Sequence, residues 1–160
     1  MKQIKYLVLL GAIAIGFTAC KNNVVDDFDA NAQLTADTIA IRKYVTDNNI
    51  PALKDKSGVF YQVVTPGSGE LVYTGNTSVT VDYSGKVLGS STNFDSSAGT
   101  PVTFKLGGLI PGWQIGIPYI QKGGQIRLFI PSGYAYGNNA QPGIPANSVL
   151  DFTIKLSNAL

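Results

Sequence analysis

Histidine is absent from this sequence of 160 residues, and cysteine occurs only once, as Cys20. The first absence excludes a Ser-His-Asp triad and any metal site with histidine ligands. The second excludes a disulfide within one chain. If Cys20 carries a lipid, no thiol remains as a nucleophile or a metal ligand. We therefore predict a function that needs neither a metal nor a cofactor.

Long hydrophobic runs are also absent, apart from one at the amino terminus. The apolar residues 6–17 follow Lys2 and Lys5 and are too few to span a bilayer comfortably, which is typical of a secretory signal. The sequence Phe17-Thr18-Ala19-Cys20 resembles a bacterial lipobox. In that interpretation residues 1–19 are a lipoprotein signal peptide, and Cys20 becomes the diacylated first residue. The alternative is an ordinary signal peptide that leaves an unpaired thiol, which would be unusual in an exported protein.

Charged residues are scarce, at 14% of the chain, with 12 Lys and Arg against 10 Asp and Glu. Because the leader contains two of the lysines, its removal would leave equal numbers of basic and acidic residues. The sequence has no basic stripe of the kind that nucleic-acid binding requires. The pairs Gly107-Gly108 and Gly123-Gly124 lack the Lys and Ser/Thr spacing of a phosphate-binding loop. We predict no nucleic-acid partner.

The chain after the leader divides into three segments. Residues 20–33 are polar and acidic without periodicity, as expected for a flexible, lipid-anchored tether. Residues 34–54 form an N-terminal helical segment. Residues 55–160 form the remaining domain, in which we find no internal repeat.

The helical segment is predicted to contain one helix over residues 36–48. Thr35 is its candidate N-cap, and Ile41, Tyr44 and Val45 form a narrow apolar stripe that can dock on the domain. Dimerisation through this helix stays open, but the helix is too short to favour it. We therefore take the protein as a monomer.

From residue 57 onward the hydrophobic period changes to two, which is typical of strands with one buried face. The strand-like segments are residues 59–64, 78–83, 102–106, 126–130 and 150–156. A short helix between Pro111 and Pro118 carries the only tryptophan, Trp113, and is the one helix in this domain that can cover the inner face. The sequence therefore predicts an α+β fold, in which a curved antiparallel β-sheet of about five strands wraps around one short α-helix.

Six short motifs follow one another in this domain. They are Val81-Asp82-Tyr83-Ser84-Gly85, Phe94-Asp95-Ser96-Ser97, Ile110-Pro111-Gly112-Trp113, Ile130-Pro131, Tyr134-Ala135-Tyr136-Gly137 and Pro142-Gly143-Ile144-Pro145. In order and approximate spacing they closely resemble an FKBP-type peptidyl-prolyl cis–trans isomerase over residues 59–156. The leader and the N-terminal helix are similar to those of bacterial, envelope-anchored members. The resemblance implies that the α+β fold is FKBP-like.

The resemblance also implies an apolar pocket for a proline ring. Its catalytic residues would be Phe94, Asp95, Trp113, Tyr136 and Phe152, and its substrate-binding residues would be Tyr83, Val102, Leu109, Ile110 and Ile144. Trp113 would form the floor, although a tryptophan can also be a core residue only. The Ile110 N–H and the Tyr136 hydroxyl would donate hydrogen bonds to the substrate. Asp95, at the buried edge, would need a donor, and Tyr83 is the candidate.

The function that the resemblance implies is acceleration of X–Pro isomerisation during the folding of envelope or secreted proteins. The chain would be anchored in the bacterial cell envelope through the lipid on Cys20. Its partners would be proline-containing polypeptides and rapamycin-type macrolides. A non-catalytic chaperone with the same pocket and an adhesin-like surface lipoprotein stay open as alternatives. The chain departs from many family members at Gln141, where they have His, and at Val102, where an aromatic residue is common.

Overall fold

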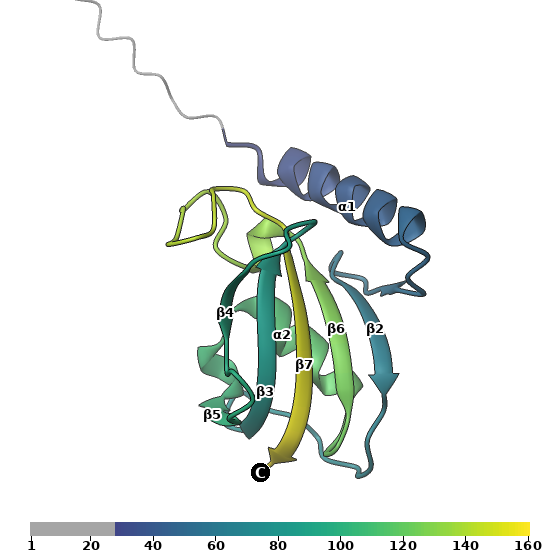
Figure 1. Cartoon of the computed structure of the whole chain (residues 1–160), viewed down its shortest axis with the longest axis vertical. Coiled ribbons are helices and arrows are strands. Elements are labelled where there is room, and N and C mark those ends of the chain that lie inside the picture. Colours follow the sequence, from purple (N-terminus) through teal and green to yellow (C-terminus); the bar gives the residue numbers. More distant parts are fainter. Residues whose placement is uncertain (1–27) are drawn as a thin grey trace, which may run out of the picture.

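The computed structural model describes residues 28–160, so the predicted signal peptide, Cys20 and most of the predicted tether lie outside the described residues. Within them, seven strands form one antiparallel sheet in the order β1-β2-β6-β7-β3-β4, and β5 also pairs with β3 (Figure 1). The predicted α+β class, with a sheet around one short helix, is confirmed. The expected number of strands, about five, was too low.

The strands are β1 (Leu53–Lys54), β2 (Phe60–Thr65), β3 (Ser78–Val87), β4 (Asn93–Ser96), β5 (Val102–Lys105), β6 (Gln125–Ile130) and β7 (Leu150–Ala159). The helices are α1 (Ala30–Asp47) and α2 (Pro111–Gly116), and the 3-10 turns are η1 (Leu106–Gly108), η2 (Ile117–Tyr119) and η3 (Ser132–Tyr134). The prediction missed β1 and β4. Both β1 residues are exposed, and so are all β4 residues except Phe94, so neither strand shows the alternation that reveals strands in a sequence.

The inner face of the sheet packs against α2. Gly112 and Gly116 lie four residues apart and so share one face of this helix. A Cβ at Gly112 would overlap the side chain of Ile130, and one at Gly116 would overlap that of Leu128. Because glycine has no Cβ, the backbone of α2 can lie directly on β6. This contact holds Trp113 against the sheet.

The outer face is covered at one end by α1, which lies beside the ends of β2 and β6 (Figure 1). Ile41 and Val45 are 0% and 7% exposed and pack with Phe60 and Phe129. The Tyr44 ring is centred 6.1 Å from the Phe129 ring. The predicted docking of this apolar stripe on the domain is therefore confirmed. Within residues 28–160, no helix combines the length and the apolar character that crossing a membrane requires.

The helix α1 begins at Ala30 and not at the predicted start, residue 36. Its N-cap is Asp29, whose Oδ1 accepts hydrogen bonds from the N–H groups of Asn31 (2.9 Å) and Ala32 (3.0 Å). The proposed cap Thr35 lies inside the helix and donates its hydroxyl to the Asn31 carbonyl. The first turns of α1 are mostly exposed, so hydrophobic periodicity gives no sign of where this helix begins.

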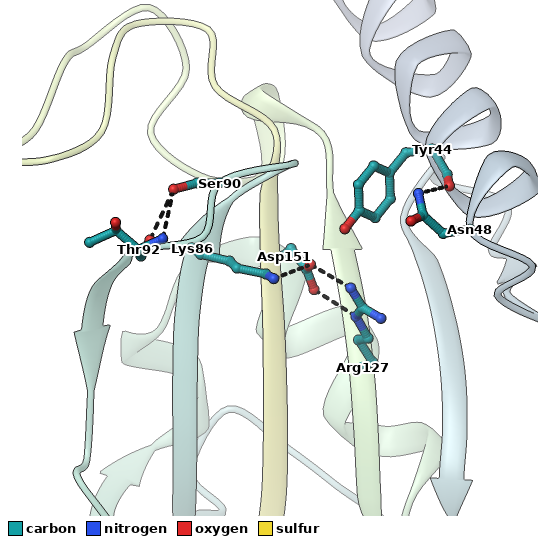
Figure 2. Close-up of polar contacts among 7 residues, drawn as sticks. All are labelled: Tyr44, Asn48, Lys86, Ser90, Thr92, Arg127 and Asp151. Carbon is teal, nitrogen blue, oxygen red and sulfur yellow. Dashed lines mark hydrogen bonds and ion pairs between the residues drawn. The ribbon is translucent and has the colours of Figure 1, made fainter.

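A buried ion pair joins β6 and β7 on the outer face (Figure 2). Arg127 donates from Nε to Asp151 Oδ1 (2.9 Å) and from Nη2 to Oδ2 (2.7 Å), while Lys86 Nζ lies 3.8 Å from Oδ2. The Asp151 side chain is only 1% exposed. The hydrogen bonds with Asp151 raise the pKa of Arg127 above its ordinary value. The bidentate geometry satisfies a carboxylate that would otherwise be buried without a close donor.

We expect Arg127→Met to lower the free energy of unfolding by about 3–5 kcal/mol, because it leaves the Asp151 charge buried without its bidentate partner. The measurement is the midpoint and slope of urea unfolding, monitored by circular dichroism. Lys43→Met is the matched control, since it breaks the exposed pair of Lys43 with Asp47 and should change stability by less than about 0.5 kcal/mol. Equal effects of the two substitutions would contradict this account of the buried pair.

Candidate functional site

An apolar pocket of about 140 Å³ opens at the side of the sheet that faces α2. Its lining residues come from β3, β4, β5, β7, the start of α2 and the segment after η3; they are Tyr83, Phe94, Asp95, Phe104, Leu109, Ile110, Trp113, Tyr136 and Phe152. Six of these nine side chains are aromatic, so the pocket offers ring faces and edges to an apolar ligand. This composition is typical of a small-molecule or peptide side-chain site.

A larger hollow of about 360 Å³ lies on the other face of the sheet. Its lining includes Asp82, Ser84, Thr153 and Lys155, which alternate along β3 and β7 with the residues of the inner face. These side chains are polar, and Tyr83 is the one aromatic residue that lines the hollow. We therefore identify the smaller, aromatic pocket as the candidate site.

Trp113 lines this pocket from α2 while it also belongs to the hydrophobic core, with 4% of its surface exposed. The rings of Tyr83 and Phe152 stand edge-on to it, each with its centroid 5.2 Å away, and Phe104 does so at 6.4 Å. Edge-to-face contacts at these distances are favourable and fix the plane of the indole. The two interpretations of Trp113, core residue and pocket residue, therefore both apply.

Two of the aromatic walls, Phe94 and Phe152, depend on a glycine in β3. Phe94 and Phe152 meet edge-to-face with centroids 5.6 Å apart. Phe152 is the register partner of Gly85, and a Cβ at Gly85 would overlap the Phe152 ring. The glycine of the Val81–Gly85 motif therefore makes room for a pocket wall.

Tyr83 and Asp95 form the polar side of the pocket. The Tyr83 hydroxyl donates to Asp95 Oδ2 at 2.8 Å, which confirms the predicted partnership. Partial burial, together with this hydrogen bond and the Asp95 charge, raises the pKa of Tyr83 to about 12, so its hydroxyl stays protonated at neutral pH. Asp95 itself is exposed, where we expected a buried edge. The hydrogen bond leaves the second carboxylate oxygen of Asp95 available to a ligand.

The segment that precedes α2 offers a backbone donor. The Ile110 carbonyl accepts from the Trp113 N–H at 3.0 Å, and Gln114 Nε2 donates to the Leu109 carbonyl at 2.7 Å. Within residues 28–160 the Ile110 N–H has no hydrogen-bond acceptor, because Ile110 precedes the first turn of the helix. Ile110 also lines the pocket, so this N–H is free to bind a ligand carbonyl at the rim.

Eight of the ten predicted pocket residues are brought together in this lining, and Val102 and Ile144 are not. Val102 is 39% exposed on β5, whereas Ile144 is buried (4% exposed) in a tight bridge with Gln141. Phe104 lines the pocket instead, and sequence reasoning missed it. Strand alternation places Phe104 on the same face as Val102, so a preference for the larger side chain would have found it. The functional role of each residue remains a prediction.

No set of three or more Cys, Asp or Glu residues is arranged to hold a metal ion in the part of the chain that the structure describes. The pocket residues also include no thiol and no lysine that could form a covalent intermediate. The chemistry that this arrangement supports is binding and orientation in an apolar environment.

Comparisons with known proteins identify relatives of this chain. FKBP-type peptidyl-prolyl cis-trans isomerase FkpA of Buchnera aphidicola subsp. Schizaphis graminum is 46% identical over 105 residues, which are 64% of this chain and 41% of the relative. FkpA of Escherichia coli K12 is 45% identical over 102 residues, which are 62% of this chain and 37% of the relative. The chain thus spans about two fifths of the length of these two relatives.

Two solved structures share the fold. The crystal structure of FkpA from Escherichia coli has a TM-score of 0.67 at 36% identity and covers 81% of this chain and 63% of that one. A peptidyl-prolyl cis-trans isomerase from Pseudomonas syringae pv. tomato has a TM-score of 0.65 at 29% identity, with 83% and 97% covered.

The match to a whole family agrees with these individual similarities. The sequence model described as FKBP-type peptidyl-prolyl cis-trans isomerase matches residues 71–157, more than half of the chain. This range contains all nine residues that line the aromatic pocket. The chain therefore belongs to the FKBP-type peptidyl-prolyl cis–trans isomerase family.

Proposed function

We propose that this protein is a peptidyl-prolyl cis–trans isomerase that accelerates X–Pro isomerisation in polypeptide clients. The observation that carries the proposal is the aromatic pocket around Trp113 with the free Ile110 N–H at its rim. The proline ring of a substrate fits between the edges of Tyr83, Phe104 and Phe152. A carbonyl of the same peptide can then accept a hydrogen bond from the Ile110 N–H. All pocket residues lie within residues 55–160, which supports this range as the isomerase domain.

The reaction needs no nucleophile, because no covalent bond is broken. Resonance keeps the peptide bond planar and gives rotation a barrier of about 18–20 kcal/mol. X–Pro bonds populate both isomers and exchange over tens of seconds or longer. Twisting the bond removes the resonance and reduces the dipole of the amide, so an apolar pocket that excludes water favours the twisted form over the planar one. The pocket therefore acts by binding the transition state more strongly than the substrate.

Side chains of the pocket and one backbone N–H then orient the substrate in this apolar environment. The proline ring lies on Trp113, and the Ile110 N–H and the Tyr136 hydroxyl donate to substrate carbonyls. Tyr83 holds one oxygen of Asp95 at 2.8 Å, so the other oxygen orients the imide from the pocket edge. Orientation of this kind is effective because each group is held in place before the substrate binds.

The site of action that we propose is the bacterial cell envelope, with Cys20 as a lipid anchor. The supporting observation is the sequence Phe17-Thr18-Ala19-Cys20 after an apolar run. Two acyl chains on Cys20 would give stable membrane attachment. Clients would be proline-containing envelope or secreted proteins, and rapamycin-type macrolides would compete with them for the pocket.

The proposed activity is tested by proline-limited refolding of a model client with residues 21–160, which keep every described residue. We expect the slow refolding phase to accelerate and a rapamycin-type macrolide to abolish the acceleration. Trp113 is the only tryptophan, so an X–Pro peptide should also change its fluorescence saturably. Saturable binding without any acceleration would refute catalysis and establish a binding module, as in a non-catalytic chaperone.

The Tyr136 hydroxyl is tested by Tyr136→Phe, which removes one hydrogen bond at nearly constant volume. Such a bond contributes about 0.5–1.5 kcal/mol, so kcat/KM should fall by about two- to twelve-fold. Tyr119→Phe is the matched control, because the Tyr119 hydroxyl donates to Asp55 (2.6 Å) and Tyr119 does not line the pocket. An unchanged kcat/KM in Tyr136→Phe would remove this hydroxyl from the mechanism.

The anchor is tested in the full-length protein with its leader, expressed in a bacterium and labelled with a radioactive fatty acid. The wild type should incorporate label and fractionate with membranes, whereas Cys20→Ala should do neither, because it lacks the thiol that the lipid modifies. Equal labelling of the two proteins would exclude Cys20 as the lipidation site.

A further inference from the structure

Asp37 is buried, with 4% of its surface exposed, where α1 meets the turn η3. Asp37 Oδ2 accepts from the Ser132 N–H (2.7 Å) and from the Ser132 hydroxyl (2.6 Å), and Oδ1 accepts from Gln33 Nε2 (2.7 Å). Among residues 28–160 no Lys or Arg forms an ion pair with it. An unpaired buried charge is expensive unless several donors satisfy it, so this contact needs an explanation beyond helix packing.

Helix packing alone would favour an apolar residue at this position. Asp37, Ile41 and Val45 lie at intervals of four on the buried face of α1, and the latter two are hydrophobic. Ser132 is fully buried and is the first residue of the 3-10 turn η3. Its N–H therefore has no acceptor within the turn. Asp37 is therefore the group that satisfies η3 across a sequence distance of 95 residues.

Ser132 in turn holds the segment that carries Tyr136. The Ser132 carbonyl accepts from the N–H groups of Ala135 (2.9 Å) and Gly137 (2.8 Å), which flank Tyr136 on both sides. Gly137 closes this turn at φ +60°, in the left-handed region that glycine tolerates best. Tyr136 lines the pocket at its exposed rim. A continuous series of hydrogen bonds thus leads from α1 to the backbone that bears the Tyr136 hydroxyl.

We propose that Asp37 is a positioning residue for Tyr136, through which the N-terminal helix α1 tunes the proline pocket. The inference rests on the proposed isomerase function. When Asp37 is lost, the Ser132 N–H lacks its acceptor, η3 shifts, and the Tyr136 hydroxyl leaves the place where it meets the substrate carbonyl. The helix on the outer face of the sheet then contributes to a pocket that it does not touch.

The direct test measures kcat/KM and its separation into kcat and KM for residues 21–160 and for Asp37→Ala. We expect kcat/KM to fall by about two- to twelve-fold, with the same separation as in Tyr136→Phe, because the same hydrogen bond is lost. Asp37→Asn should recover most of the activity, since its amide oxygen can accept both Ser132 donors while its nitrogen faces a flipped Gln33 amide. Val45→Ala, two turns further along the same face, is the control and should lower stability without changing kcat/KM.

A double variant shows whether Asp37 acts through Tyr136. In Asp37→Ala combined with Tyr136→Phe, we expect kcat/KM to be no lower than in Tyr136→Phe alone. If the two losses multiply instead, Asp37 does not act through this hydroxyl and the proposal is overturned. A reduction in Asp37→Ala that Val45→Ala reproduces would also overturn it, since both would then reflect general loosening.

Amide hydrogen exchange tests the same link without any substrate. The N–H groups of Ala135 and Gly137 should exchange faster in Asp37→Ala than in wild type, and at the wild-type rate in Val45→Ala. Unchanged exchange in Asp37→Ala would refute the positioning role even if the protein is an isomerase. If exchange is faster in Asp37→Ala but the wild type binds X–Pro peptides without catalysis, only the isomerase activity is refuted. The peptide affinity from Trp113 fluorescence then replaces kcat/KM as the readout. If Asp37→Ala does not fold, Asp37→Val takes its place, because it fills a similar volume without an acceptor for the Ser132 N–H, and it is compared with Val45→Ala by the same criteria.

Discussion

The direct contact between α2 and β6 is the constraint on which the pocket depends. Two glycines on one face of α2, Gly112 and Gly116, let its backbone lie against Ile130 and Leu128. Trp113 projects from the same turn, so its place relative to the sheet follows from this contact. In the part of the chain that the structure describes, the Ile110 N–H has no partner for a related reason: it precedes the first turn of a helix held in that position. One packing constraint thus positions both the apolar base and the backbone donor.

The sheet uses its two faces for different purposes. The inner face supplies aromatic walls to the pocket, and close approach again depends on a glycine, Gly85 under the Phe152 ring. The outer face carries the buried pair of Arg127 with Asp151 (Figure 2). It also carries the apolar surface on which α1 docks. Because η3 lies where β6 leaves the sheet, α1 reaches the pocket segment from the outer side through Asp37.

The residues that line the site include no histidine, cysteine or lysine. One of its two tyrosines, Tyr83, has a raised pKa of about 12 and stays protonated at neutral pH, and its hydroxyl binds the carboxylate of Asp95. A reaction that only rotates a bond needs groups of this kind, which orient a substrate and do not exchange protons with it. The absence of histidine from the sequence is consistent with such a reaction, because no general base is required.

The sequence by itself determined the fold class, five of the seven strands within residues 28–160 and the short helix with Trp113, because alternation and proline positions act within a few residues along the chain. It also indicated the contact of Tyr83 with Asp95, because a carboxylate that is buried needs a hydrogen-bond donor. Only the tertiary structure decided that Phe104 and not Val102 lines the pocket, since both lie on the same face of one strand. It alone revealed the bond of Asp37 with Ser132, because residues 95 positions apart meet only when α1 docks, and no local pattern records that distance.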